Sequence, residues 1–237
     1  TEAHHAARRA ELPYEQARTD ISRAALHLAL GDLERVGQLL GRNRVALHFG
    51  ARTDLKLSYR EIMAHYRLAE GDRLAALATF QAAEAEADRT GFAILGAYFL
   101  GMIGVLTADP DALLEAMDLL EDTGDRRLSA TLLYYGGTVG GDAEVLEFAV
   151  EEARVSGDRF LLLEVLHATG GSRAQHEARR VVARIEEHLP ASLAPFFQQH
   201  PAVQWCRTAV EPRPPELPFM PSIDRDFHPD FALLDDS

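Results

Sequence analysis

Cysteine and positive charge are scarce in this chain of 237 residues, and each scarcity excludes a class of protein. Cys206 is the only cysteine, so no disulfide forms within the chain, which is typical of a reducing compartment. The formal net charge of −13 argues against general binding to nucleic acid, which needs a basic face, and against anionic membrane surfaces. We therefore expect a cytoplasmic protein that binds neither nucleic acid nor a membrane.

Long hydrophobic runs are also scarce. The segment 91–108 lacks charge for 18 residues, which is the lower edge of what a membrane-spanning helix needs. It holds four glycines and lacks flanking basic clusters, so we expect a fully buried central helix, with a spanning helix as the alternative. No signal peptide is visible, and the chain starts Thr-Glu-Ala rather than Met. We therefore expect a piece of a longer or processed protein.

Motifs of catalysis and metal binding are mostly missing. Cys206 would need a nearby base and an electropositive setting to act as a nucleophile, so a structural thiol is favoured. Glu164 and His167 have the Glu-x-x-His spacing of di-iron bundles, but the only other copy is at residues 2 and 5. We expect no catalytic residue, no metal and no cofactor. An enzyme of an unrecognised helical class remains the alternative.

The chain does contain helical periodicity. Residues 53–91 form two runs with apolar residues at spacings of three and four, separated by Gly71 and Asp72. Gly71 is suited to end the first helix in a left-handed conformation, and Asp72 to cap the second. A second Gly-Asp pair stands forty residues earlier, at 31–32, which indicates a repeat. No segment alternates with the period of a β-strand.

Five helix pairs of this kind follow one another along the chain. The expected pairs are 12–30 with 32–49, 53–70 with 72–91, 92–108 with 111–123, 126–139 with 143–156, and 159–169 with 173–189. Ser172 is the expected cap of the last helix. Repeated pairs of about 33–40 residues predict an all-α fold, an α-solenoid over residues 12–206. A polar extension, 1–11, precedes it, and a tail, 207–237, follows it.

The second pair resembles a tetratricopeptide repeat. Its matching residues supply the small residue, the turn, and the Ala, aromatic and Ala of the second helix: Ala64, Gly71-Asp72, Ala76, Phe80 and Ala83. Gly101 takes the small-residue place in the third pair. Two positions depart from the pattern, since Arg60 stands at the tryptophan position and the tyrosine is displaced to Tyr66.

Over about residues 12–205, the chain looks like the tetratricopeptide-like arms of large bacterial signal-transduction ATPases and kinases. In such arms the first helix of each pair lines the concave face. The resemblance therefore implies an apolar, partner-binding wall made of Ile62, His65, Tyr98, Phe99, Met102, Leu132, Tyr135, Leu162 and Val165. The alternative is that these residues are core between helices.

The resemblance implies a non-catalytic interaction, scaffold or regulatory module whose partner is another protein or peptide segment, within a larger signalling assembly. A second hypothesis is a sensor arm of a signalling ATPase or transcription regulator, with a small ligand in a closed pocket of convergent polar groups.

Residues 211–237 differ from the rest, with six prolines, seven acidic residues and two arginines. Proline removes backbone donors and breaks helices, so this stretch predicts an extended tail. It also carries more apolar residues than a solvated linker needs: Leu217, Phe219, Met220, Ile223, Phe227, Phe231, Leu233 and Leu234. We expect the tail to pack along the solenoid, where it would compete with a partner peptide. A disordered acidic end is the alternative.

Overall fold

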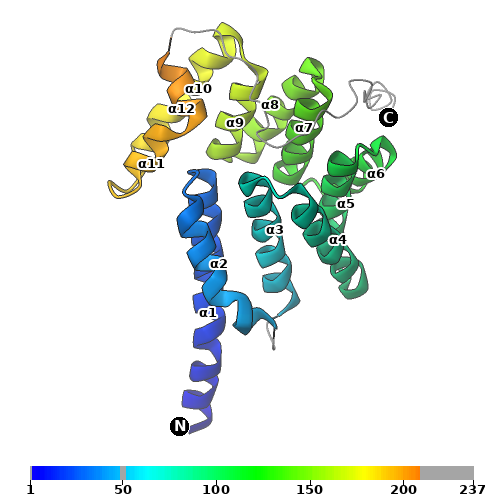
Figure 1. Ribbon diagram of the computed structural model, residues 1–237, viewed down its shortest axis with the longest axis vertical. Helices are drawn as coiled ribbons and strands as arrows, with labels where there is room; N and C mark the ends of the chain where they lie inside the picture. Colours follow the sequence, from blue (N-terminus) through cyan, green and yellow to red (C-terminus); the bar gives the residue numbers. More distant parts are fainter. Residues whose placement is uncertain (1, 49–51, 209–237) are drawn as a thin grey trace. The chain divides into compact units, whose positions relative to one another are not determined.

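The computed structural model describes residues 2–48 and 52–208, and all regular secondary structure in these ranges is helical (Figure 1). The prediction of an all-α fold is thus confirmed for the described ranges. The chain divides into two compact units, Thr1–Phe92 and Ala93–Ser237, which we call the N-terminal and C-terminal units. The tail contacts expected at residues 217–231 lie outside the described residues.

The N-terminal unit is built from two pairs of consecutive helices. Helices α1 and α2 pack together, α3 packs on both of them, and α4 packs on α3. The bounds of these helices are α1 Glu2–Ala29, α2 Leu33–His48, α3 Thr53–Glu70 and α4 Arg73–Thr90.

The first helix begins earlier than the sequence predicted. Helix α1 begins at Glu2 rather than Leu12, so residues 2–11 are helical and continue into the rest of α1. The stretch is rich in alanine, glutamate and arginine, which have high helix propensity. Adding residues to an existing helix needs no new nucleus, so an apolar stripe is not required for the helix to extend.

The core of the N-terminal unit lies where the helix pairs meet. Ala24, Val36, Leu39 and Leu40 are at most 1% exposed, and side chains of α3 pack against them. Those partly buried α3 side chains include Ile62. The second pair therefore covers apolar surface that the first pair cannot bury alone, as expected for repeated helical hairpins.

The C-terminal unit contains three further pairs and two short helices. Each helix from α5 to α10 packs on the next one along the chain, and α5 also packs on α7, and α7 on α9. Helix α12 packs on α9, α10 and α11. The bounds are α5 Ala93–Thr107, α6 Pro110–Glu121, α7 Arg126–Gly140, α8 Ala143–Ser156, α9 Arg159–Thr169, α10 Gly171–Glu186, α11 Ala194–Gln199 and α12 Pro201–Arg207.

Gly-Asp pairs separate the helices as predicted. Gly71 has a φ of 88°, in the left-handed region that favours glycine, and it ends α3. The Asp72 carboxylate accepts a hydrogen bond from the backbone N–H of Ala75 at 3.0 Å and caps α4. Asp142 caps α8 in the same way, with bonds from the backbone N–H groups of residues 144 and 145.

The predicted Ser172 cap is wrong. Helix α10 begins at Gly171, and its N-cap is Gly170, so no side chain caps this helix. Both glycines have φ values above 70°, so backbone freedom makes the turn that an aspartate makes elsewhere. The two glycines move the helix start one residue upstream of the serine.

Several residues that carry the resemblance to a tetratricopeptide repeat lie in the core. Ala64, Ala76, Phe80 and Ala83 are all 0% exposed. Arg60, at the tryptophan position, forms a polar bridge from α3 to α4: Nη1 donates to the carbonyl of Ala82 at 2.8 Å, and the guanidinium pairs with Glu86. An ion pair and a hydrogen bond thus occupy the position at which the tetratricopeptide pattern has tryptophan.

Helix α5 is the uncharged segment of the sequence, and it has 15 residues. Two glycines let neighbouring helices approach it closely. A Cβ atom on Gly101 would meet side chains of Leu132 and Ala116, and one on Gly104 would lie 2.9 Å from the backbone of α6. Within residues 2–48 and 52–208, no helix combines the length and apolar character needed to cross a bilayer.

Candidate functional site

The predicted binding wall divides between the two units. Ile62 and His65 belong to α3 of the N-terminal unit and are half-buried. Ile62 packs against both apolar clusters of that unit. The His65 ring meets Phe80 edge-on at 5.5 Å between ring centroids. Both side chains therefore contribute to packing between helices.

Six of the other predicted wall residues are buried in the C-terminal unit. Tyr98, Phe99, Met102, Leu132 and Val165 are at most 1% exposed, and Leu162 is 9% exposed. These side chains offer almost no surface to a partner in this structure, and they occupy the place that the alternative interpretation, core between helices, assigns to them.

Tyr135 is the last predicted wall residue and is half-buried. Its ring lies 5.1 Å from that of Tyr134. Burial and the negative charge of Glu164 raise the pKa of the Tyr135 phenol above its ordinary value, so the hydroxyl stays protonated.

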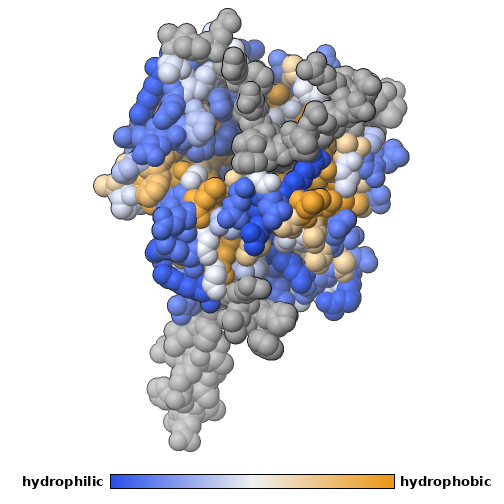
Figure 2. All heavy atoms as spheres, in the orientation of Figure 1, coloured by the Kyte–Doolittle hydropathy of each residue, from blue (hydrophilic) through white to orange (hydrophobic). Residues whose placement is uncertain are grey.

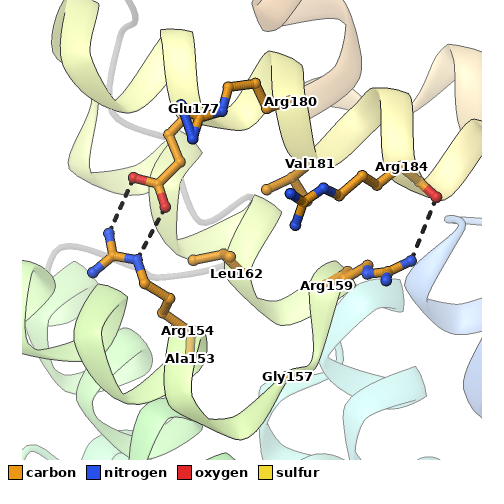
Figure 3. A pocket seen from close by; sticks show the side chains of 9 residues that line it. All are labelled: Ala153, Arg154, Gly157, Arg159, Leu162, Glu177, Arg180, Val181 and Arg184. Carbon is orange, nitrogen blue, oxygen red and sulfur yellow. Dashed lines mark hydrogen bonds and ion pairs between the residues drawn. The ribbon is translucent and has the colours of Figure 1, made fainter.

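An open groove of about 460 Å³ lies between α8, α9 and α10 of the C-terminal unit (Figure 3). It was not predicted from the sequence. Four of its lining residues are arginines, so we call it the arginine groove. The full lining is Ala153, Arg154, Gly157, Arg159, Leu162, Glu177, Arg180, Val181 and Arg184. In the view of Figure 2 the surface over α10 and α12 is mainly hydrophilic.

The turn between α8 and α9 shapes one side of the groove. Gly157 ends α8 with a φ of 75°, and the Asp158 carboxylate then caps α9 through the N–H groups of Phe160 and Leu161. This short turn brings Arg154 at the end of α8 and Arg159 at the start of α9 to the lining of the same groove (Figure 3).

Arg154 is held in place by two carboxylates. Its Nε and Nη2 atoms donate to the two carboxylate oxygens of Glu177 at 3.1 and 3.0 Å, and Nη1 donates to Glu151. This fork geometry is the strong form of the arginine–carboxylate pair. The hydrogen bonds that Arg154 donates to Glu177 and Glu151 raise the pKa of Arg154, and the bond from Arg154 lowers the pKa of Glu151. Arg154 is therefore already neutralised.

The other arginines of the groove are less constrained. Arg159 Nη1 donates to the backbone carbonyl of Arg184 at 3.5 Å. Within the described ranges, no hydrogen bond or ion pair holds the guanidinium groups of Arg180 or Arg184. Four arginines and one glutamate give the groove lining a formal charge of +3, although the whole chain carries −13.

The arginine groove thus joins cationic walls to an apolar floor. Leu162 and Val181 form the floor, at 9% and 7% exposure. Guanidinium groups bind carboxylates or phosphates with directed pairs of hydrogen bonds. The arrangement is therefore suited to a ligand that carries both anionic and apolar groups.

A signal for this site is visible in the sequence. The run RRVVAR at residues 179–184 places Arg180 and Arg184 four residues apart, on one face of a helix. Sequence reasoning does not reveal that α8 and α9 bring Arg154 and Arg159 to the same face, because this depends on how the pairs stack.

The Glu164 and His167 pair has a structural role. Glu164 Oε1 lies 2.8 Å from His200 Nε2, a contact that ties α9 to the start of α12. His167 is buried, its ring lies 5.2 Å from that of Trp205, and desolvation lowers its pKa. Across residues 2–48 and 52–208, no group of three or more His, Cys, Asp or Glu side chains is placed to hold a metal ion.

Comparison of the chain with protein-family models, with curated proteins and with solved structures gave no match. The fold and the site therefore define the class of protein by themselves. It is an all-helical chain of two compact units, the second of which carries an arginine groove.

Proposed function

We propose that the chain is a non-catalytic interaction module of the tetratricopeptide-like solenoid kind, which binds an acidic polypeptide segment in the arginine groove. One observation carries this proposal. In a chain of net negative charge, Arg180 and Arg184 lie beside an apolar floor, and no carboxylate of the described residues neutralises them. The order of helix pairs within each unit supports the repeat architecture, because each pair packs on the one before it.

The charge distribution of the chain favours a partner that is acidic where it contacts the groove but not acidic throughout. A net charge of −13 repels a uniformly acidic protein, especially at low salt. A short segment that contains both acidic and apolar residues interacts mainly with the local groove, which is positively charged. Its carboxylates pair with Arg180 and Arg184, while its apolar side chains cover Leu162 and Val181.

The test uses the full chain and a defined probe. The probe is a fluorescein-labelled peptide of about 14 residues built from aspartate and leucine, and its neutral counterpart carries asparagine in place of aspartate. We expect fluorescence anisotropy to show binding of the acidic probe only. The double variant Arg180→Glu/Arg184→Glu should weaken this binding at least about tenfold, since reversed charges repel the probe.

The matched control is Arg23→Glu/Arg42→Glu, which makes the same change in net charge at two exposed residues of the N-terminal unit. It should bind the acidic probe like the unchanged chain. Equal binding of acidic and neutral probes, or no effect of the groove variant, would contradict the proposal.

A second candidate function is a sensor arm for a small anionic ligand. The specific observation in its favour is the size of the groove, about 460 Å³, which falls within the range of ligand pockets. Titration with inorganic phosphate and with a short apolar dicarboxylate separates the two candidates. Calorimetry should show saturable binding of one of these probes if the groove is a small-ligand site, and none if it needs a polypeptide.

In a longer protein, a module of this kind serves as a regulatory or scaffold arm. That wider role, in a cytoplasmic bacterial signalling assembly, rests on the resemblance stated for residues 12–205 and is part of the proposal.

A further inference from the structure

The C-terminal tail of the chain has the composition that the arginine groove is suited to bind. Residues 211–237 carry seven acidic residues and two arginines. In the segment Ile223–Phe227, Asp224 and Asp226 flank Arg225, and an apolar residue stands at each end. The tail lies outside the described residues, which end at Thr208.

That end point is anchored on α10, the helix that forms one wall of the groove. The carbonyl of Thr208 accepts a hydrogen bond from Gln175 Nε2 at 2.8 Å, and Arg179 Nε donates to the carbonyl of Cys206 at 2.7 Å. At about 100° per residue, Arg184 lies on the opposite side of α10 from Gln175, roughly 180° around the helix. The tail therefore starts on one face of α10, and the groove lies on the other.

The tail is long enough to join these two faces. A helix with its side chains is about 10–12 Å across, so half its circumference is roughly 16–19 Å. Sixteen residues separate Thr208 from Asp224, and an extended chain of that length spans up to about 50 Å. No movement of the helices is needed.

The spacing of charges also fits. Residues two apart in an extended segment lie on the same side, about 6.6–7 Å apart. Residues four apart on a helix lie on one face, roughly 6 Å apart along its axis. Asp224 and Asp226 therefore match Arg180 and Arg184 in both spacing and side. Arg225, between the two aspartates, faces away from the groove.

We propose that the segment Ile223–Phe227 of the tail occupies the arginine groove of its own chain. Asp224 and Asp226 pair with Arg180 and Arg184. The proposal rests on the function proposed above and adds a regulator to it, because the bound tail competes with an external acidic segment. Exposed ion pairs are individually weak, but a short tether supplies a local concentration in the millimolar range, which compensates for low affinity.

The first experiment measures trypsin cleavage after Arg225 in the full chain. The other tail arginine, Arg213, precedes a proline, so trypsin does not cleave there, and Arg225 is the single trypsin site of residues 209–237. The variant Arg180→Glu/Arg184→Glu should speed cleavage after Arg225 at least about tenfold, because cleavage follows the population of released tail. The control Arg23→Glu/Arg42→Glu should leave the rate unchanged.

A double-mutant cycle separates tail release from the sequence preference of trypsin. Asp224→Asn/Asp226→Asn should also speed cleavage, partly because trypsin disfavours neighbouring acids. If the tail sits in the groove, adding Arg180→Glu/Arg184→Glu to this variant has little further effect. Additive effects overturn the proposal. Protection that increases with protein concentration also overturns it, because a second copy of the chain then supplies the tail.

The anisotropy probe distinguishes this proposal from the function on which it rests. The chain with Asp224→Asn/Asp226→Asn should bind the acidic probe several-fold more tightly than the unchanged chain, since its own tail competes less. Equal binding by both chains, with the arginine dependence kept, overturns only the tail proposal. Failure of both chains to bind the probe overturns the proposed function itself.

Discussion

Arg180 and Arg184 decide the chemistry of the groove because Arg154, beside them, is already paired. Two carboxylates hold Arg154, so it orders the junction of α8 and α10 and adds little free positive charge. The guanidinium groups of Arg180 and Arg184 have no such partner among the residues that the structure describes. Contact with Glu177 therefore gives Arg154 a structural role, whereas Arg180 and Arg184 remain available to a ligand.

The sequence favoured a structural thiol at Cys206, and the environment of this residue agrees. Cys206 is 3% exposed, and burial raises the pKa of its thiol to about 11. Arg179 and Arg207 act in the opposite direction but do not compensate for the burial. The thiol is therefore neutral at physiological pH.

We predict that Cys206 reacts slowly with Ellman's reagent in the folded chain. At pH 8 the thiolate fraction is at least about a hundredfold lower for a pKa near 11 than for the ordinary value near 8.5. The measurement compares the native chain with the chain in guanidinium chloride, and Cys206 gives the whole signal. Comparable rates in the two states would contradict the assignment.

At the scale of the helices, glycine has two distinct roles. Gly71 and Gly157 end helices in the left-handed region, and the aspartate that follows caps the next helix. Gly101 and Gly104 lie inside α5, where they allow neighbouring helices to approach closely. The pattern Gly-Asp identifies the first role in the sequence. The second was assigned only to Gly101, through the resemblance, because close approach depends on which helix packs on α5.

We predict opposite effects of alanine at two helical glycines. In Gly104→Ala the new Cβ would lie 2.9 Å from Asp109 O and Leu113 N, so the helices must separate, at a cost of about 1–3 kcal/mol. In Gly41→Ala no atom lies within 4 Å, so the higher helix propensity of alanine should stabilise α2 by about 0.5–1 kcal/mol. Urea unfolding followed by circular dichroism measures both. If both variants changed the free energy of unfolding in the same direction, helix propensity alone would account for the effects, which would contradict the prediction.

At the scale of the whole molecule, contacts divide the chain at Phe92. The sequence predicted one continuous repeat array over residues 12–206, and the helix pairs it predicted are present on both sides of this division. The groove belongs entirely to the C-terminal unit.

We predict that the two units unfold as separate steps. Trp205 is the only tryptophan and lies in the C-terminal unit, so its fluorescence reports that unit, whereas circular dichroism reports both. Gly104→Ala should lower the midpoint seen by fluorescence, and Gly41→Ala should leave that midpoint unchanged. A single transition, shifted by both variants in both signals, would show that the units unfold together.

Helix pairs, their boundaries and their caps follow from the sequence alone, because they depend on local interactions. The spacing of apolar residues, the left-handed glycines and the capping aspartates are signals that extend over only a few residues, so they can be read directly from the sequence. Where a local signal misled, as at Ser172 and at residues 2–11, another local property prevailed: backbone freedom at Gly170 and Gly171, and helix propensity at the N-terminus.

The site was decided by tertiary structure. Tyr98, Phe99 and Met102 have the composition of a binding wall, but the packing of α5 against α6 and α7 buries them. Arg154 and Arg180 stand 26 residues apart in the chain, and only the stacking of α8, α9 and α10 brings them to one groove. The hydrophobic effect is non-directional, so the identity of the buried faces depends on contacts between segments that are distant in sequence. The packing of the helices therefore determines which faces are covered, and charged side chains on the uncovered faces become available for binding.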